Sequence, residues 1–409
     1  MRSTHYRNNS TPARGRYPSR GGGYGRPAFR RGNRGGSRGG RPGEHIDVSR
    51  FINKAEPDAI VEVYEPKNRF SDFEVDVRIK ENIAKKGYET PTPIQDQSIP
   101  HIVQGRDIVG IANTGTGKTG AFLIPLLDKV VRIRSERVLI MVPTRELAVQ
   151  IEEEYRGFSH GSGLQSACVV GGANIGPQIR ALRSDPFFVI GTPGRLKDVM
   201  ERRALDLSRF KTLVLDEADR MLDMGFINDI RAIVSRMPKG RHTLFFSATL
   251  SREIEKLIGD FLVDPIRVSV KTGDTAKTVN QDIVRLQGKN KLDVLEDLLT
   301  KPEFDKVLIF GRTKHGVERL SKTLTAHGFK AASIHGNKTQ SNRQRALGDF
   351  KKDQIRILVA TDVAARGLDI PKVSHVINFD VPNSYEDYVH RIGRTGRAGQ
   401  GGHALTFID

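Results

Sequence analysis

Ten short apolar runs, each four or five residues long, alternate with longer segments of helical character along most of this chain. The first five runs are Asp107–Ile111, Val138–Val142, Phe187–Ile190, Thr212–Leu215 and Thr243–Phe246. The second five are Val307–Phe310, Ala331–Ile334, Ile355–Val359, His375–Phe379 and Ala404–Ile408. Continuous apolar strands separated by helices are typical of parallel sheets that are covered by helices on both faces. The pattern therefore predicts an α/β fold with two domains of similar size.

Changes in composition divide the chain further. A length of 409 residues exceeds one ordinary hydrophobic core. Lys271–Asn280 is polar and without periodicity, so it is interpreted as a linker. We expect a tail at 1–43, an N-terminal extension at 44–69, domain 1 at 70–270, the linker at 271–280 and domain 2 at 281–409. Within the extension, Ile60–Tyr64 alternates like a short strand and is expected to pack on domain 1.

The first 43 residues contain eleven Arg, eleven Gly and no Lys, Asp or Glu, and they supply +11 of the formal net charge of +18. Such a segment cannot bury a core, so a disordered Arg/Gly-rich tail is predicted. Guanidinium groups interspersed with Tyr6, Tyr17, Tyr24 and Phe29 suit phosphates and unstacked bases of any sequence. Contact with nucleic acid is the favoured interpretation, and a tail that only keeps the protein in solution is the alternative.

Cysteine content and hydropathy indicate the compartment. Cys168 is the single cysteine, so no intrachain disulfide can form, and its apolar neighbours make it a core residue. No apolar run approaches the ~20 residues that a membrane span requires, and the N-terminus lacks the apolar stretch of a secretory signal. A cytoplasmic protein without membrane contact is expected.

A glycine-rich loop follows the first apolar run and precedes a helix-like stretch, and it reads Ala112-Asn113-Thr114-Gly115-Thr116-Gly117-Lys118-Thr119. Glycines let backbone N–H groups point at phosphate oxygens, and the helix N-terminus adds partial positive charge. Lys118 is expected to reach the β- and γ-phosphates, and the Thr119 hydroxyl to ligate Mg²⁺. Ala112 stands where the usual phosphate-loop pattern begins with glycine.

Two other nucleotide-binding patterns fit less well. Gly115 to Gly120 also matches G-x-G-x-x-G, but a dinucleotide site needs an acidic residue at the end of the next strand. That strand instead ends Val142-Pro143-Thr144. A guanine site is disfavoured because the nearest candidate, Asn337-Lys338-Thr339-Gln340, lacks the final Asp.

Acidic residues end a later apolar run, which reads Leu213-Val214-Leu215-Asp216-Glu217-Ala218-Asp219. A carboxylate at the end of a buried strand, downstream of a phosphate loop, is suited to hold Mg²⁺, and this predicts Asp216 as a metal ligand. Glu217 is placed to orient or deprotonate the attacking water. Loop and acidic motif together predict a nucleotide hydrolase.

With Asp216-Glu217-Ala218-Asp219, the chain resembles a DEAD-box RNA helicase of helicase superfamily two, over roughly residues 70–409 and with the motifs in the family's order. The resemblance implies two tandem RecA-like parallel-sheet domains and ATP with Mg²⁺ as cofactors. It further implies that Gly87 to Gln95 is the adenine-selecting motif, with Gln95 bonding the base and with Tyr88 and Thr90 in the same motif. Phe70, seventeen positions before Gly87, is expected to stack on the base, whereas Phe73 is assigned to the core.

By the same resemblance, Ser247 and Thr249 of Ser247-Ala248-Thr249 would bond Asp219 and couple hydrolysis to RNA separation. In the second domain the sequence His390-Arg391-Ile392-Gly393-Arg394-Thr395-Gly396-Arg397 carries three arginines three residues apart, a spacing that places them on one face if the segment is helical. Arg394 and Arg397 are expected to act as arginine fingers, and Arg391 to link to the acidic motif. Asp369 would meet the ribose hydroxyls.

Further motifs resemble the family's RNA-gripping segments and offer hydroxyls, backbone N–H groups or guanidinium groups at strand ends. The residues expected to contact RNA are Thr144, Arg145, Gly172, Thr192, Arg195, Arg312, Gln340, Arg343 and Thr361. None of them is an obvious base reader, so the RNA contact is expected to be independent of sequence. The tail is expected to contribute to it.

The expected activity is RNA-stimulated ATP hydrolysis coupled to local, non-processive unwinding of RNA duplexes or remodelling of ribonucleoprotein. A monomer is expected, with ribonucleoprotein or ribosome-assembly complexes as candidate partners. One rival hypothesis is a DNA-translocating relative in the same superfamily, which the adenine motif and the acidic motif disfavour. Another is an RNA clamp that binds ATP without turnover, which the presence of Glu217, Arg394 and Arg397 disfavours.

Overall fold

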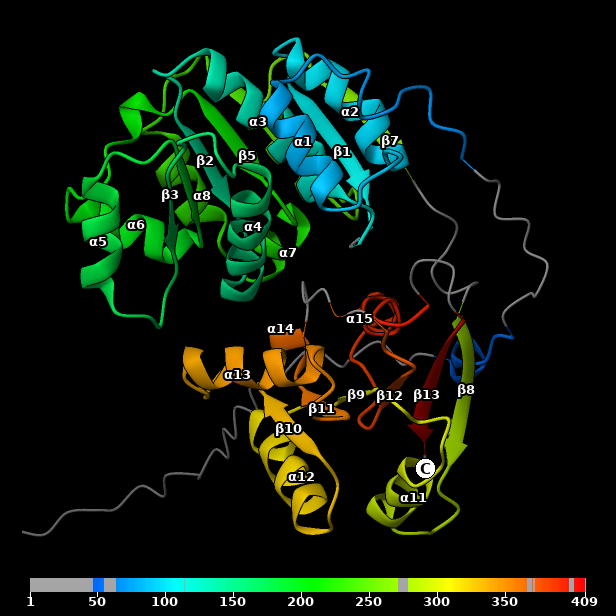
Figure 1. The fold of residues 1–409 in the computed structure, drawn as a ribbon. Helices are drawn as coiled ribbons and strands as arrows, with labels where there is room; N and C mark the ends of the chain where they lie inside the picture. Colours follow the sequence, from blue (N-terminus) through cyan, green and yellow to red (C-terminus); the bar gives the residue numbers. More distant parts are fainter. Residues whose placement is uncertain are drawn as a thin grey trace, which may run out of the picture. The chain divides into compact units, whose positions relative to one another are not determined.

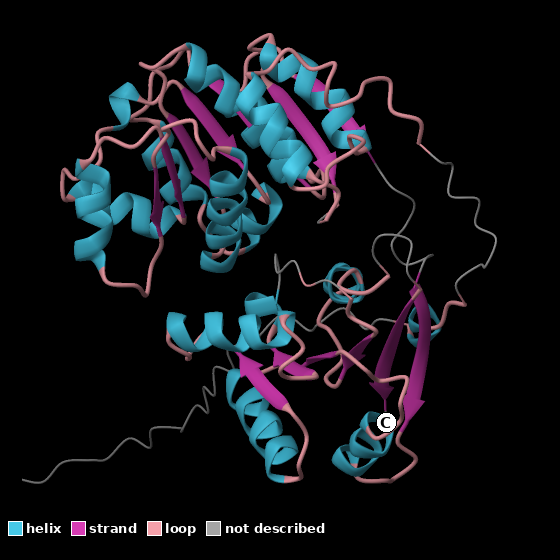
Figure 2. Cartoon of the chain, viewed as in Figure 1, coloured by secondary structure: helices cyan, strands magenta, loops and turns pink. Residues whose placement is uncertain are grey.

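The computed structural model describes residues 47–54, 64–113, 115–270, 279–365, 370, 372–396 and 401–408. These residues form two α/β domains, each with a central sheet flanked by helices (Figures 1 and 2). The predicted Arg/Gly-rich tail and most of the predicted linker lie outside the described residues. Among the described residues, no helix has both the length and the apolar character that crossing a bilayer requires.

The sheet of domain 1 has seven strands, all parallel, in the order β3-β4-β2-β5-β6-β1-β7. Their bounds are β1 (Ile108–Ala112), β2 (Val138–Met141), β3 (Ser166–Val169), β4 (Phe188–Gly191), β5 (Thr212–Leu215), β6 (His242–Ser247) and β7 (Ile266–Val270). Strands β1, β2, β4, β5 and β6 are buried along their whole length, as expected for a sheet covered on both faces.

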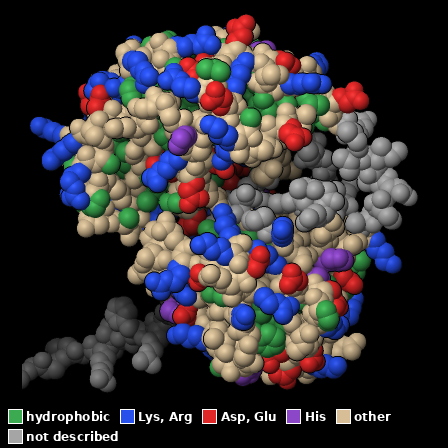
Figure 3. Space-filling view, viewed as in Figure 1, with side chains coloured by type: hydrophobic (Ala, Val, Ile, Leu, Met, Phe, Trp, Pro, Cys, Tyr) green, Lys and Arg blue, Asp and Glu red, His purple; other side chains and the backbone are tan. Residues whose placement is uncertain are grey.

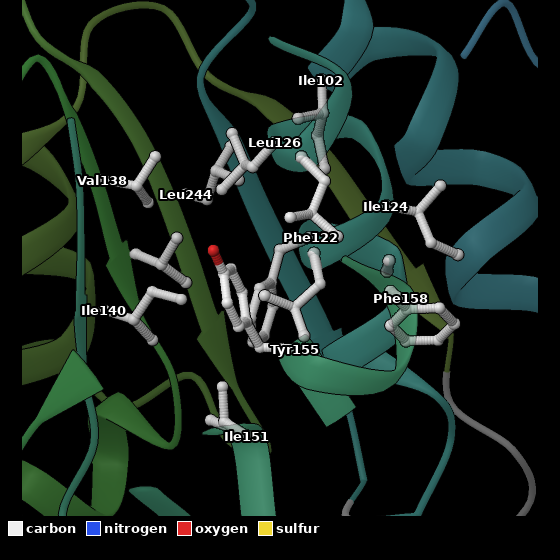
Figure 4. Close-up of a cluster of buried hydrophobic side chains, with 14 of the residues drawn as sticks. Ile102, Phe122, Ile124, Leu126, Val138, Ile140, Ile151, Tyr155, Phe158 and Leu244 are labelled. Atoms are coloured by element: carbon white, nitrogen blue, oxygen red, sulfur yellow. The ribbon is translucent and has the colours of Figure 1, made fainter. Parts of the chain in front are cut away.

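Helices cover both faces of this sheet. The bounds are α1 (Val77–Lys85), α2 (Pro93–Val103), α3 (Lys118–Arg132), α4 (Arg145–Phe158), α5 (Ile175–Arg183), α6 (Pro193–Glu201), η2 (Leu207–Arg209), α7 (Ala218–Asp223), α8 (Ile227–Val234) and α9 (Arg252–Phe261). Apolar residues of α1–α4 form one core with the sheet, which includes Phe122, Tyr155 and Leu244 (Figure 4). Apolar residues of α5–α9 form a second core on the other face.

Domain 2 has a six-stranded parallel sheet in the order β10-β11-β9-β12-β13-β8. The strands are β8 (Val279–Arg285), β9 (Val307–Phe310), β10 (Ala331–Ile334), β11 (Ile357–Ala360), β12 (His375–Asn378) and β13 (Gly402–Ile408). The helices are α11 (Lys291–Leu299), α12 (Lys314–Ala326), α13 (Gln340–Lys351), α14 (Asp362–Ala365) and α15 (Tyr385–Ile392). The predicted fold class is confirmed.

All ten predicted strands are present, with ends shifted by at most two residues, but three further strands were not predicted. These three, β3, β7 and β8, each lie at the edge of a sheet. Their burial is partial and alternating, so their sequences lack the continuous apolar run of a central strand. Strand β8 begins at Val279, inside the segment that was predicted to be linker.

The N-terminal extension behaves differently from expectation. Residues 47–53, which we call the N-terminal strap, include the short 3₁₀ helix η1 (Val48–Phe51) and pack against domain 2. Of the predicted strand Ile60–Tyr64, only Tyr64 is described; it is not in a strand, and its hydroxyl donates a hydrogen bond to Asp96 in domain 1. The extension therefore contacts domain 2 first and domain 1 second.

Gly110 is expected to be intolerant of a side chain, because a Cβ there would come within 2.5 Å of the buried Phe246 ring. Gly110→Ala should lower the free energy of unfolding of domain 1 by about 1–3 kcal/mol through overpacking. Gly240→Ala is the matched control, since its Cβ would meet no atom within 4 Å. Thermal unfolding followed by circular dichroism measures both, and equal melting temperatures for the two variants would contradict the packing argument.

Candidate active site

The phosphate loop connects β1 to the N-terminus of α3, which starts at Lys118. Gly115 and Gly117 have φ of 86° and 93°, a region that favours glycine, so the backbone turns sharply before the helix. The Thr116 hydroxyl donates to the Asn113 carbonyl at 2.8 Å and closes this turn. Thr119 is half-buried in the first turn of α3, and Thr114 lies outside the described residues. The loop has the strand–loop–helix geometry of a phosphate cradle.

Lys118 is buried, and its Nζ lies 3.7 Å from Oδ1 of Asp216, the residue that follows β5. That ammonium makes no hydrogen bond within the described part of the chain. Burial raises the pKa of the Asp216 carboxyl to about 6, although the Lys118 charge opposes the rise. The two buried charges lie too far apart for a hydrogen bond to each other. Lys118 therefore remains able to bind a phosphate, and Asp216 a cation.

Glu217 adopts a left-handed conformation with φ 52° and ψ 50°, which is strained for a residue with a side chain. Its Oε2 lies 3.0 Å from Nη1 of Arg220. Burial would raise the pKa of Glu217, but the positive charges of Arg220, Lys118 and Arg394 outweigh burial and lower it. Glu217 is thus held as a carboxylate next to the metal-ligand candidate. Arg220 was not predicted, although its position three residues after Glu217 on a helix is the signal for such a pair.

Gln95 lies fully buried in α2 and connects the predicted adenine motif to the phosphate loop. Its Oε1 accepts a hydrogen bond from the Thr92 N–H at 2.9 Å, and its Nε2 donates to the Gly117 carbonyl at 3.0 Å. A Cβ on Gly117 or Gly120 would come within 2.7 Å of Nε2, so both glycines permit this approach. Each end of the amide has one protein partner in these bonds, which leaves one acceptor site on Oε1 and one N–H on Nε2 for a base.

The aromatic residues near the adenine motif are more deeply buried than expected. Phe70 is 5% exposed and belongs to the core, with edge-to-face contacts to Phe73 at 6.0 Å and to Tyr88 at 6.1 Å between ring centroids. The assignment of Phe73 to the core agrees with the structure. Thr90 is exposed. Asp96, which was not predicted, accepts hydrogen bonds from Tyr64, Lys67 and Asn68 and thereby holds the segment before Phe70.

The coupling residues lie together in domain 1. Oδ2 of Asp219 accepts hydrogen bonds from the Thr249 hydroxyl at 3.2 Å and from the Ala248 and Thr249 N–H groups at 3.0 Å. The expected bond from the Ser247 hydroxyl is not present, because that hydroxyl donates to the Thr249 carbonyl at 2.8 Å. One of the two predicted side-chain contacts is therefore observed.

The expected link from Arg391 to the acidic motif is not what the structure shows. Arg391 forms a bidentate pair with Asp362, at 2.5 and 2.8 Å, and donates to Asn378 and to the Asp380 carbonyl, all within domain 2. These contacts use most of its N–H donors, so Arg391 is a buried residue that holds parts of domain 2 together.

The prediction that the three arginines share one helix face is also corrected. Helix α15 ends at Ile392, with Gly393 as its cap, and Gly396 has φ 66°. Arg394 therefore lies in the turn beyond the helix, where it is 3% exposed and its Nε donates to the His390 carbonyl. Arg397 and Asp369 lie outside the described residues.

The predicted RNA-contact residues occupy strand ends and helix starts in both domains. Thr144 and Thr192 are the N-cap residues of α4 and α6, and Gln340 and Arg343 lie at the start of α13. The Arg145 guanidinium lies where a side chain at Gly172, φ 72°, would project. The remaining three follow strand or motif ends: Arg195 donates to the Ala173 carbonyl, Arg312 to the Val381 carbonyl, and Thr361 follows β11. Arg343 also pairs with Glu146 at 2.9 Å.

Cys168 lies in β3 and packs partly buried against the first core. Burial raises the pKa of its thiol to about 12, so the thiolate is disfavoured. The interpretation as an inert core residue agrees with the structure.

A phosphate loop, a strand-end carboxylate and two parallel-sheet domains define a nucleotide-binding protein with tandem RecA-like domains. The profile of the DEAD/DEAH box helicase family matches residues 92–257, and that of the helicase conserved C-terminal domain matches residues 290–399. The chain belongs to the DEAD-box helicase family.

Similar proteins support this assignment. The ATP-dependent RNA helicase CshA of Listeria monocytogenes is 46% identical over 342 residues, which cover 83% of this chain and 66% of the relative. CshA of Limosilactobacillus reuteri is 45% identical over 342 residues, which cover 83% and 69%. The chain thus spans about two thirds of the length of these curated relatives.

Two solved structures are similar to both domains. Saccharomyces cerevisiae Dbp5 bound to RNA and ADP BeF3 is 28% identical, with a TM-score of 0.74 and coverage of 83% of this chain and 89% of that one. Mss116p bound to ssRNA and AMP-PNP is 29% identical, with a TM-score of 0.75 and coverage of 84% and 76%.

Arg391→Ala should destabilise domain 2, because it leaves Asp362 without its bidentate partner and empties a buried site. Breaking such a pair costs about 3–5 kcal/mol. Arg319→Ala, at an exposed arginine of α12, is the control and should have little effect. Chemical denaturation would measure both variants; unchanged stability of Arg391→Ala together with lost nucleotide turnover would instead favour a direct catalytic role.

Proposed function

We propose that this chain is an RNA-stimulated ATPase that separates short RNA duplexes locally, without long-range translocation. The observation that carries the proposal is the buried Lys118–Asp216 pair, 3.7 Å apart at the end of the phosphate loop, with the charged Glu217 beside it. Relatives named ATP-dependent RNA helicases share 45–46% of the aligned sequence. Dbp5 and Mss116p, which share the fold, were solved with RNA bound.

ATP would bind with its β- and γ-phosphates at Lys118 and at the N–H groups of the loop, residues Ala112 to Thr119. Asp216 and the Thr119 hydroxyl would hold Mg²⁺, which neutralises phosphate charge when bound. No cluster of three or more metal-ligating side chains exists in the described ranges. Mg²⁺ usually takes few protein ligands and completes its shell with phosphate oxygens and water.

Recognition of adenine would fall to the segment around Gln95, with Phe70, Tyr88 and Thr90 beside it. Gln95 donates a hydrogen bond to the Gly117 carbonyl, which connects the base-selecting segment to the phosphate loop. Asp369 would bind the ribose hydroxyls. This connection would make the shape of the phosphate loop depend on which base is bound.

Hydrolysis would use Glu217 to orient the attacking water, and Arg394 and Arg397 to neutralise charge that develops in the transition state. Support comes from the positive charge of Arg394, which is among the causes that lower the pKa of Glu217. Because these arginines belong to domain 2, turnover would require both domains. The contacts between Asp219 and Thr249 would transmit the state of the acidic motif to the RNA site.

RNA would be bound through its phosphates and sugars by the nine predicted contact residues. These are Thr144, Arg145, Gly172, Thr192, Arg195, Arg312, Gln340, Arg343 and Thr361. The visible face in Figure 3 carries Lys and Arg interspersed with Asp and Glu, without one uniformly basic surface. Local hydroxyls, N–H groups and guanidinium groups of the strand-end residues are the candidates for the grip. The Arg-rich residues 1–43 would add affinity that does not depend on sequence. A monomer acting in the cytoplasm, within ribonucleoprotein or ribosome-assembly complexes, completes the proposal.

Lys118→Ala and Glu217→Gln should each reduce RNA-stimulated ATP turnover by at least ~100-fold. The first removes a positive charge at the phosphates, and the second removes the carboxylate that orients the attacking water. Lys239→Ala, at an exposed lysine, is the control and should keep wild-type turnover. Phosphate release with and without RNA is the measurement, with circular dichroism to verify folding.

Three outcomes of that assay would contradict the proposal. Wild-type turnover in Glu217→Gln would show that Glu217 is not the carboxylate that orients the attacking water. Stimulation by DNA as strong as by RNA would favour the DNA-translocating alternative. Tight ATP binding by the wild-type chain without phosphate release would favour an RNA clamp.

The raised pKa of Asp216 predicts a pH effect on Mg²⁺ dependence. As pH falls through about 6, Asp216 takes up a proton and can no longer ligate a cation, so turnover should fall. Higher Mg²⁺ concentrations should shift this acidic limb to lower pH, because metal and proton compete for one carboxylate. ATPase pH profiles at two Mg²⁺ concentrations test the prediction, and an acidic limb that ignores Mg²⁺ would disprove it.

A further inference from the structure

The N-terminal strap, residues 47–53, is part of domain 2 in its contacts although it precedes domain 1 in the sequence. Phe51 is 1% exposed and packs in a cluster with Val279, Tyr388, Ile392 and Ala404, all of domain 2. Its ring meets that of Tyr388 edge-to-face, with centroids 4.7 Å apart. The cluster is completed by this one side chain from the far end of the sequence.

Two polar contacts fix the strap on the same surface. The Arg50 guanidinium lies 3.6 Å above the centroid of the Tyr385 ring, a cation–π arrangement. Asn53 forms an antiparallel bridge with Gln281 of β8, through hydrogen bonds of 3.0 and 2.7 Å between their backbone N–H and carbonyl groups. Strand β8 is the edge of the domain 2 sheet, so the strap covers a stretch of open strand edge.

The strap also reaches α15 through β8. The Tyr388 hydroxyl donates to the Gln281 side chain at 2.9 Å, while the Gln281 backbone bonds Asn53. One face of α15 is lined by Tyr385, Tyr388 and Ile392, which are spaced i, i+3 and i+7. This face packs in the same apolar cluster as Phe51 of the strap and Val279 of β8. One face of α15 therefore contacts a segment that lies outside the continuous sequence of domain 2.

We propose that the strap is a positioning element for ATP hydrolysis: by packing on Tyr385 and Tyr388 it fixes α15, and with it Arg394 in the turn beyond. The proposal rests on the proposed function, since it takes Arg394 to act on the nucleotide. It assigns Phe51 and Arg50 a role in turnover, although neither residue belongs to a nucleotide motif. Nucleotide binding itself depends on domain 1 and should be spared.

Phe51→Ala in the full chain tests this inference. We expect kcat for RNA-stimulated ATP turnover to fall ~10-fold while the KM for ATP stays within about twofold, because only the placement of a transition-state charge is lost. Phe51→Leu should restore most of kcat. Ile52→Ala is the matched control, since Ile52 lies in the same strap but is 49% exposed. Arg50→Ala, a surface change that domain 2 should tolerate, should give a smaller fall in kcat.

Amide hydrogen exchange of Tyr385–Ile392 provides a second readout that does not depend on activity. Exchange should be faster in Phe51→Ala than in the wild type, and unchanged in Ile52→Ala. Faster exchange with unchanged kcat would make the strap merely structural and overturn the proposal, as would unchanged exchange. A wild-type chain without RNA-stimulated turnover would sink the proposed function, and the exchange result would then decide alone whether the strap positions α15.

Discussion

The buried pair of Lys118 and Asp216 is the constraint on which the rest of domain 1 depends. Two charges removed from water cost free energy that their separation of 3.7 Å recovers only in part, and the raised pKa of Asp216 reports this imbalance. A polyphosphate with its cation would satisfy both groups at once. The parallel sheet brings this pair together, because Lys118 and Asp216 both follow the carboxyl ends of parallel strands, which lie at one edge of the sheet.

Neighbouring groups keep this edge ready. Glu217 is held in a strained left-handed conformation, and Arg220 keeps its carboxylate charged. Gln95 holds the loop through a hydrogen bond to the Gly117 carbonyl. Backbone strain at Glu217, the charge of Arg220 and the hydrogen bond of Gln95 are therefore all found around the phosphate loop. Strained residues of this kind cluster at active sites, where the surrounding structure holds them.

The sequence predicted the parts that repeat a strong local pattern. Central strands were found because both faces are buried. The phosphate loop was found because its glycines and its Lys-Thr pair stand between an apolar strand and a helix-like stretch. Strands β3, β7 and β8 escaped because partly buried or exposed residues are interspersed with the buried ones, which removes the continuous apolar run. The pairing of Arg391 with Asp362 was missed because spacing cannot show that a residue twenty-nine positions earlier lies beside it. The burial of Phe70 and the docking of Phe51 likewise depend on tertiary neighbours that no local pattern announces.

The strap belongs to domain 2 by its contacts, so in the sequence domain 1 lies between two segments of domain 2. Domain 2 is therefore discontinuous, and a ribosome must synthesise all of domain 1 before the docking surface for Phe51 exists. At ordinary elongation rates this delay is on the order of tens of seconds, and during it the Phe51 ring has no docking surface. Domain 1 can complete its core in that time, so the order of synthesis would make docking of the strap a late step in folding.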